Sequence, residues 1–295
     1  MCCYPAIGSI YQHGDPNTRV KHNIFSQLAL MDSSKGTLIL IGGHEDKRDD
    51  LTILKRVAER GTEGKPLVLV AGGTTVANEI IRDYRPVFKD LGVREIRALD
   101  IRTREDAYDD KFVSQIDDAG AIFFTGGDQL KLTSQIGETP LFKAIAKAYE
   151  DGAVVAGTSA GAAAMPETMI IGGSDAGSID AEGINMAPGF GLLSGVVVDT
   201  HFAQRGRVGR LLAMVASNPK NLGLGIDEDT AIVVRDGEFF VMGSGAVYVI
   251  DGNGITYTSL SERRQGIVTV CDVKLHLLAQ DAVFDLVNRK PTETR

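Results

Sequence analysis

The sequence predicts an α/β protein with a mostly parallel sheet, helices on both faces of that sheet and a β-hairpin added toward the C-terminus. Short apolar runs alternate with amphipathic segments of about 10–15 residues, which is typical of strands and helices in a parallel sheet. Several of these runs end in glycine pairs, as at Gly72-Gly73 and Gly126-Gly127, where a strand turns into a helix. An Asp236-Gly237 pair joins two later strand-like runs and is a strong hairpin signal.

The predicted elements follow one another in a regular order. Strand-like runs rich in Val, Ile and Leu occur at residues 37–41, 66–70, 95–99, 121–124, 153–156 and 196–199. Helical periodicity lies between most of them, at residues 50–60, 76–91, 105–116, 140–149 and 205–216. The hairpin covers residues 232–242, an edge strand is expected at 247–250 and a final helix at 273–287. Residues 1–35 are irregular and polar and predict an N-terminal extension, which leaves residues 36–295 as a single domain.

Composition excludes several classes of protein. The 295 residues are 43% hydrophobic, and no apolar run approaches the roughly 20 residues of a membrane span. A net charge of −8 argues against a nucleic-acid partner. The N-terminal segment lacks a secretory pattern and the three cysteines form no disulfide framework, so a cytoplasmic protein is expected. No Cys or His spacing indicates zinc, and neither a metal nor another cofactor is predicted.

The most informative motif is Gly157-Thr-Ser159-Ala-Gly161, which follows an apolar run and precedes an Ala-rich segment. A serine on such a strand-to-helix turn projects its hydroxyl from the carboxyl edge of the sheet, with a helix N-terminus behind it. The glycines leave room for the tight backbone and for an approaching carbonyl carbon. The motif predicts that Ser159 is a nucleophile. The simpler interpretation is a glycine-rich turn that only packs a helix on the sheet.

A serine nucleophile needs a general base, and the sequence contains five histidines. His201 ends the strand-like run 196–199, at the edge where Ser159 is expected, and is the best candidate. Another short apolar run is followed by Asp227-Glu228-Asp229, which offers three acids to orient the histidine. Alternation does not decide among these acids. The order Ser, His, acid differs from that of the α/β-hydrolases, which argues against that fold.

Oxyanion donors are expected on the neighbouring strand end. The strand-like run 121–124 leads into two glycines and then into residues that begin a helix. Backbone N–H groups at Gly127 and Asp128, together with that of Ala160, are predicted to hold the negative oxygen of a tetrahedral intermediate.

A cluster of arginines follows the predicted base. Arg205, Arg207 and Arg210 lie within six residues of an otherwise acidic chain. Because arginine binds carboxylates bidentately, the cluster predicts a clamp for an anionic substrate or a substrate carboxylate. A solvated helix face is the simpler interpretation. For a substrate that also carries a guanidinium group, Asp128 and Asp199 are the expected partners.

Together these residues resemble the cyanophycinase branch of the S51 serine peptidases. The resemblance spans about residues 37–250 and rests on segments in the same order, at Ile41–Lys47, Thr125–Gln129, Gly157–Ala162, Asp199–Arg210 and Gly225–Ala231. The family implies a flavodoxin-like fold related to class I glutamine amidotransferases, with serine replacing their cysteine. It also implies a homodimer and an exopeptidase that hydrolyses cyanophycin, a poly-aspartate with arginine on each β-carboxyl, to β-Asp-Arg dipeptides.

The resemblance also implies roles for individual residues. By motif position, Ser159 matches the nucleophile, His201 the base and Glu228 the third member of the triad. The positions that match the substrate pocket are Gln129, Asp199, Thr200, Arg205, Arg207 and Arg210.

Some features of the chain leave alternatives open. Related dipeptidases place their acid shortly after the serine, so Asp175 remains a rival to Glu228. Thr200 stands where many cyanophycinases have glutamine, and His44 stands where a small residue is common. One alternative is therefore an isoaspartyl or aspartyl dipeptidase that acts on small peptides. A second is a non-catalytic protein that binds an acidic metabolite.

Overall fold

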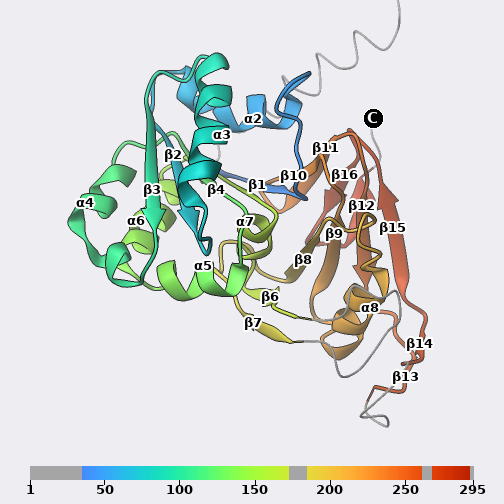
Figure 1. The fold of residues 1–295 in the computed structure, drawn as a ribbon. Helices are drawn as coiled ribbons and strands as arrows, with labels where there is room; N and C mark the ends of the chain where they lie inside the picture. The colour runs from blue at the N-terminus through green and yellow to red at the C-terminus, as the bar shows by residue number, and fades with distance from the viewer. Residues whose placement is uncertain (1–34, 173–184, 261–267, 293–295) are drawn as a thin grey trace, which may run out of the picture. The chain divides into compact units, whose positions relative to one another are not determined.

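The computed structural model describes residues 35–172, 185–260 and 268–292 (Figure 1). The predicted N-terminal extension lies outside these ranges, apart from Lys35. A nine-stranded sheet runs in the order β17-β16-β11-β10-β1-β5-β4-β2-β3. Its strands are β1 (Thr37–Ile41), β2 (Leu67–Gly72), β3 (Ile96–Ile101), β4 (Ala121–Phe124), β5 (Val154–Thr158), β10 (Thr230–Arg235), β11 (Glu238–Gly243), β16 (Val283–Asp285) and β17 (Lys290–Thr292).

The half of this sheet from β1 to β3 is parallel, and the half from β10 to β17 is antiparallel. The predicted α/β class is therefore confirmed, and β10 and β11 form the predicted hairpin. Since parallel strands share one carboxyl edge, the ends of β1, β5 and β4 lie side by side. Ile41, for example, is paired with Thr158.

Helices cover both faces of the parallel half, as Figure 1 shows. One face is covered by α2 (Thr52–Thr62) and α3 (Ala77–Asp90), and the other by α5 (Gln129–Ile136) and α6 (Pro140–Glu150). Alternation along β1 explains the two layers. Ile39 and Ile41 belong to one buried cluster with the α2 and α3 side chains, whereas Leu38 and Leu40 belong to the other with those of α5 and α6. No helix in the described ranges is long and apolar enough to cross a membrane.

A second sheet of four strands runs in the order β15-β12-β9-β8. Its strands are β8 (Val196–Thr200), β9 (Leu222–Ile226), β12 (Val247–Asp251) and β15 (Lys274–Leu278), and α8 (Val208–Ser217) connects β8 to β9. The prediction that the run 196–199 belongs to the main parallel sheet is wrong. The two sides of β1 are occupied by β5 and β10, so β8 pairs with β9 instead.

Two predicted helices differ in the structure. The helix expected at residues 273–287 is replaced by β15 and β16, which pair with β12 and β11. The segment 105–116 breaks into η1 (Glu105–Tyr108), α4 (Asp110–Val113) and η2 (Ser114–Ile116). The first break falls at Asp109, which has an extended backbone and caps α4 by accepting a hydrogen bond from Lys111 N–H. Short strand pairs complete the fold, β6 (Thr168–Ile170) with β7 (Met186–Pro188) and β13 (Tyr257–Thr258) with β14 (Val270–Cys271).

Candidate active site

Ser159 lies on the sharp turn between β5 and α7 (Ala160–Ala163), with φ of 53° and ψ of −115°. This rarely populated backbone is the geometry of a nucleophile elbow. The turn depends on small neighbours, because a Cβ atom on Gly157 would lie 2.6 Å from the Gly161 carbonyl carbon. The hydroxyl is partly exposed above the carboxyl edge of the sheet.

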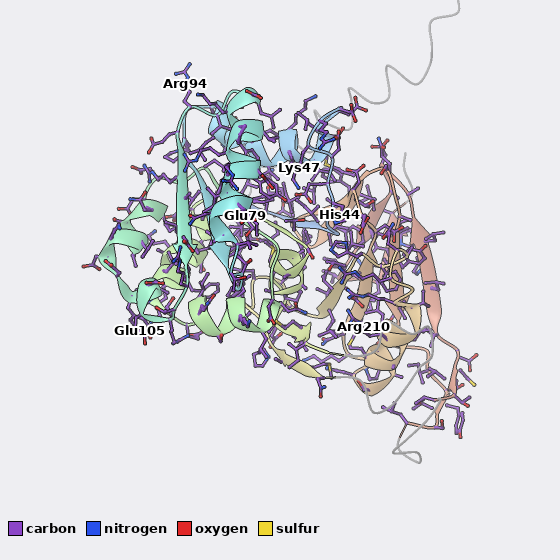
Figure 2. The ribbon with its side chains drawn as sticks, viewed as in Figure 1. His44, Lys47, Glu79, Arg94, Glu105 and Arg210 are labelled. Atoms are coloured by element: carbon purple, nitrogen blue, oxygen red, sulfur yellow. The ribbon has the colours of Figure 1, made fainter. Side chains whose placement is uncertain are left out.

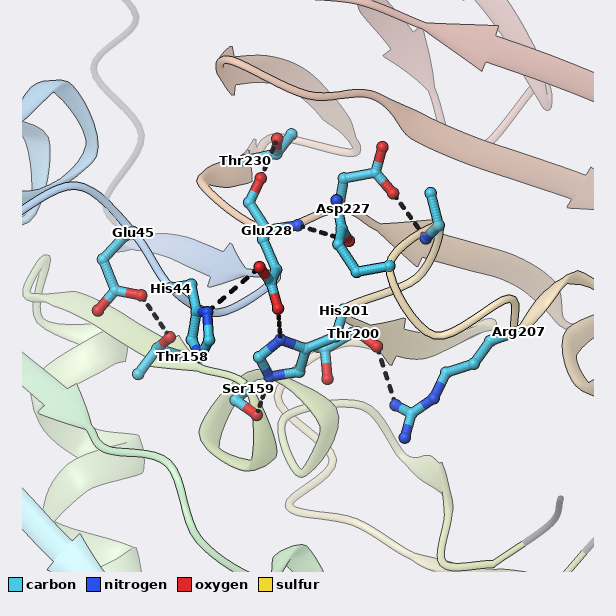
Figure 3. A network of polar contacts seen from close by, with 12 residues as sticks. His44, Glu45, Thr158, Ser159, Thr200, His201, Arg207, Asp227, Glu228 and Thr230 are labelled. Carbon is cyan, nitrogen blue, oxygen red and sulfur yellow. Dashed lines mark hydrogen bonds and ion pairs between the residues drawn. The ribbon is translucent and has the colours of Figure 1, made fainter. Parts of the chain in front are cut away.

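His201 approaches this hydroxyl from the second sheet. It directly follows β8, is buried, and has a left-handed backbone with φ of 50°. Its Nε2 atom lies 2.8 Å from Ser159 Oγ (Figure 3). The His201 ring packs so closely on Gly43 that a Cβ atom there would overlap it. A glycine after β1 is therefore required for the histidine to reach the serine.

Glu228 completes a chain of hydrogen bonds. Glu228 lies on the loop after β9, and its Oε1 atom is 2.7 Å from His201 Nδ1. The neighbouring acids face elsewhere. Asp227 is buried and accepts hydrogen bonds from Ala203 N–H and Ala246 N–H, and Asp229 accepts from Asp46 N–H and the Ser244 hydroxyl. The structure thus separates three adjacent acids that residue alternation alone left equivalent, whereas the rival Asp175 lies outside the described residues.

The end of β1 holds these loops together. The Ile41 carbonyl accepts a hydrogen bond from Ser159 N–H, the Gly42 carbonyl from His201 N–H, and the Gly43 carbonyl from Asp229 N–H. The sequence predicted no separate role for the Gly42-Gly43 pair. In the structure it links the serine, histidine and acid loops, which belong to different sheets.

Burial and nearby charges set the protonation states of His201 and Glu228. Burial lowers the pKa of His201 below its ordinary value, and the Arg205 charge acts in the same direction, while the hydrogen bond to Glu228 opposes both. Burial alone would raise the pKa of Glu228, but the hydrogen bond from His201 and the nearby His44 outweigh it and lower that pKa. A neutral histidine beside an ionised glutamate follows at neutral pH, which is the state a general base requires.

Two nearby residues were given no site role in the sequence analysis. His44 lies exposed on the loop after β1 (Figure 2), with Nδ1 3.2 Å from Glu228 Oε2. Glu45 is buried, and its carboxylate accepts hydrogen bonds from the Thr158 hydroxyl at 2.7 Å and from the Tyr84 hydroxyl. Glu45 therefore anchors the residue before the nucleophile. Only the motif Ile41–Lys47 pointed toward this segment.

The predicted oxyanion donors differ in availability. Asp128 N–H donates to the Gly73 carbonyl at 3.0 Å, so this amide is occupied. Gly127 N–H makes no backbone hydrogen bond in the described chain. Ala160 N–H is at the first position of α7, where helical amides have no partner within the helix. Ala160 directly follows Ser159, and a Cβ atom on Gly126, the residue before Gly127, would lie 3.7 Å from Ser159 Cβ.

The arginine cluster is arranged differently from the predicted clamp. Arg210 forms two hydrogen bonds to Asp199, one of them from Nε at 2.8 Å, and Arg207 Nη1 lies 3.1 Å from the same carboxylate. Both oxygens of Asp199 are therefore engaged by arginines of this chain, although a substrate guanidinium was expected there. Arg205 is exposed and has no ion pair within the described residues.

The other predicted pocket residues lie close by. Gln129 begins α5 and donates from Nε2 to the Ile170 carbonyl at 2.8 Å, and Thr200 is buried with its carbonyl accepting from Arg207.

Within the described ranges, one group of three histidine or acidic side chains is close enough together to hold a metal ion, formed by His44, His201 and Glu228. The arrangement can therefore supply a nucleophile, a base with its orienting acid, and amide donors for a developing oxyanion.

Known proteins of one peptidase family are similar to this chain. The profile of peptidase family S51 matches residues 38–242. Cyanophycinase from Nostoc sp. is 36% identical over 263 residues, which cover 87% of this chain and 88% of the relative, and cyanophycinase from Trichormus variabilis matches to the same extent. The crystal structure of a peptidase from an acI-B1 actinobacterium shares the fold, with a TM-score of 0.60 and 23% identity over 83% of this chain and 98% of that one. The chain belongs to peptidase family S51 and is a peptidase.

Proposed function

We propose that this chain is a serine-type exopeptidase that hydrolyses cyanophycin to β-Asp-Arg dipeptides. The observation that carries the proposal is the continuous chain of hydrogen bonds from Ser159 through His201 to Glu228. The substrate class is supported by the relatives, since a chain 36% identical over most of its length is described as cyanophycinase. A cytoplasmic location, a homodimer and a single domain over residues 36–295 belong to the same proposal.

In this proposal Ser159 Oγ attacks the scissile carbonyl carbon and its proton passes to His201 Nε2. Glu228 holds the Nδ1 proton and stabilises the imidazolium that forms. Gly127 N–H and Ala160 N–H bind the developing oxyanion. His201 then gives the proton to the leaving amine, and a water molecule deprotonated by the same nitrogen hydrolyses the acyl-enzyme. Arg205 is the expected contact for a substrate carboxylate.

The test is incubation of the purified protein with insoluble cyanophycin, followed by mass spectrometry of the soluble products. We expect β-Asp-Arg from the wild type and a rate at least about a thousandfold lower for Ser159→Ala. Ser134→Ala is the matched control, because Ser134 is an exposed serine on α5 whose hydroxyl donates to the Lys131 carbonyl and whose backbone contact with Arg104 is kept by alanine. Release of other isoaspartyl dipeptides without attack on the polymer would favour the dipeptidase alternative. Full activity in Ser159→Ala would refute the nucleophile.

A further inference from the structure

His44, His201 and Glu228 form a cluster that exceeds what the proposed reaction needs. The three residues are far apart in the sequence, yet one ligand atom from each lies within 4.8 Å of the other two. Glu228 binds both histidines, with Oε2 3.2 Å from His44 Nδ1 and Oε1 2.7 Å from His201 Nδ1. His44 has no place in the hydrolytic steps, so its presence beside the acid calls for another explanation.

We infer that these three side chains bind a Zn²⁺ ion and that the bound ion inhibits the enzyme reversibly. Imidazole nitrogen and carboxylate oxygen are ligands that zinc prefers, and three protein ligands with a water in the fourth position are a common zinc arrangement. The binding part of this inference stands independently. Only its inhibitory effect rests on the proposed function.

Two of the three distances between ligand atoms are close to those of a zinc site, and the third, between the two histidines, is within 4.8 Å and shortens if His44 moves toward the ion. Zinc–ligand bonds of about 2.0–2.1 Å place neighbouring atoms of a tetrahedron about 3.3 Å apart. The His44 Nδ1 to Glu228 Oε2 distance of 3.2 Å already matches this spacing. The shorter contact between His201 and Glu228 has to open by about half an ångström for the ion to enter. The His44 side chain is 74% exposed, so it can adjust its position and leaves a path from solvent.

Inhibition follows from the number of protons on a neutral imidazole. In the resting site, the His201 Nδ1 proton is donated to Glu228 and the Nε2 lone pair accepts the Ser159 hydroxyl. For a zinc ion to bind Nδ1, the Nδ1 proton leaves to water and zinc takes the lone pair freed on that nitrogen. Nε2 takes up a proton from water in exchange, so the ring remains neutral with its single proton on Nε2. Nε2 then donates to Ser159 and cannot accept its proton, so the general base is lost. Removal of zinc restores the original tautomer.

Zinc binding is tested first without reference to activity. Full-length Ser159→Ala protein, stripped with a chelator and dialysed, is titrated with Zn²⁺ in a calorimeter. The same titration is made with His44→Ala and with His276→Phe added to this background. His276→Phe is the control, because it removes both ring nitrogens of a histidine on β15 while an aromatic ring is kept against Phe284. We expect His44→Ala to weaken one site at least about tenfold, since even supporting partners of metal ligands contribute that much. Other histidines and cysteines contribute equally to all three proteins.

Inhibition is tested on cyanophycin hydrolysis by proteins that keep Ser159, the wild type and His44→Ala. Each rate is divided by the rate of the same protein in EDTA. We expect Zn²⁺ to inhibit, EDTA to restore the rate and Mg²⁺ to have no effect, because Mg²⁺ prefers oxygen ligands. His44→Ala should need at least about tenfold more zinc. The inference would be overturned if zinc bound equally well with and without His44. It would also be overturned if zinc inhibited the wild type and His44→Ala equally, or if the inhibition persisted in EDTA. If no cyanophycin is cleaved at all, the proposed substrate fails and the calorimetric comparison still decides the zinc site.

Discussion

Four residues around the candidate site have left-handed backbones. His44, Ser159, His201 and Asp229 have φ values of 48°, 53°, 50° and 47°. Each such conformation costs on the order of 1–3 kcal/mol in a residue with a side chain, and the hydrogen bonds from the end of β1 hold three of these loops in place. The strain turns each chain back over the sheet edge directly after its strand. That turn is what brings short side chains from separate strands into contact.

The pH dependence of hydrolysis follows from the buried state of His201. The residue has to be neutral to accept the Ser159 proton, and burial lowers the pKa of His201 below its ordinary value of 6.5. The value of kcat/KM should therefore rise with pH through a midpoint below 6.5 and be constant near pH 7. The profile is measured in EDTA so that metal ions do not contribute. A midpoint above pH 7 would contradict this account.

Glu228→Gln should change the same profile in a defined direction. The hydrogen bond and charge of Glu228 raise the pKa of His201, so their loss should move the midpoint to still lower pH. At the plateau, kcat should fall by about 10²–10⁴-fold, because the histidine is no longer held in the correct tautomer. Asp229→Asn is the neighbouring control, and Asp175→Asn tests the rival acid. If Asp175→Asn lost activity and Glu228→Gln had little effect, Asp175 and not Glu228 would be the acid that orients His201.

Local signals in the sequence predicted that the side chains of Ser159 and His201 lie close together, as they do in the structure. The expected reason was only partly right, because His201 follows β8 of the second sheet and not a strand of the sheet that carries Ser159. The local signals were not sufficient to choose Glu228 over Asp227. That choice depends on how the loop after β9 packs against the end of β1, where Asp229 N–H donates to the Gly43 carbonyl, and this contact joins segments more than a hundred residues apart. The roles of His44 and Glu45 depend on the same long-range packing.

At the scale of elements, β8 and α8 are joined by a buried ion-pair network. Asp199 on β8 binds Arg210 of α8 and Arg207 just before it, and these arginine side chains are only 10% exposed. A buried carboxylate that engages two guanidinium groups fixes where α8 begins, directly after the loop that carries His201. The cluster that the sequence presented as one clamp therefore contains a structural part and an exposed part, Arg205.

Two substitutions separate these parts. Asp199→Asn should lower the free energy of unfolding by about 3–5 kcal/mol, because it removes the anion from buried arginines. Arg205→Ala should leave stability within about 0.5 kcal/mol and lower kcat/KM, mainly through KM. Urea unfolding and steady-state kinetics measure the two effects. Arg94→Ala is the control for loss of an exposed arginine, since Arg94 precedes β3 at the opposite sheet edge. Unchanged kinetics in Arg205→Ala would leave the substrate carboxylate to another residue.

Sequence periodicity located most helices and strands of the parallel half, since each has a clear apolar pattern. It failed at residues 273–287, where apolar side chains fit either a helix or strands. The choice is made by tertiary contacts, because β15 forms the edge of the smaller sheet beside β12, and β16 pairs with both β11 and β17 in the larger one. The second sheet was not predicted for the same reason. Nothing local to β8 shows that both neighbours of β1 are already in place.

At the scale of the whole molecule, the candidate site is divided between the two sheets. Ser159 follows a strand of the nine-stranded sheet, whereas His201 and Glu228 follow strands of the four-stranded sheet. The 2.8 Å contact between Ser159 and His201 therefore depends on how the sheets dock. The C-terminal segment contributes to this docking, because β15 belongs to the smaller sheet and β16 to the larger one.

Phe284 is the residue at which this docking can be tested. It is fully buried on β16, stacks on Phe239 of β11 at 5.4 Å between ring centroids, and meets His276 of β15 edge to face at 5.5 Å. Phe284→Ala should lower the free energy of unfolding by about 3–5 kcal/mol through lost burial and the cavity left behind. It should also lower kcat by a larger factor than it changes KM. Weaker packing between the two sheets misaligns Ser159 and His201 but leaves Arg205 unaltered. Val287→Ala, at a side chain 79% exposed, should change neither quantity. Urea unfolding combined with kinetics on the folded variant decides between the two effects: lower stability with an unchanged kcat would mean that the aromatic contact stabilises the fold but does not set the alignment of the site.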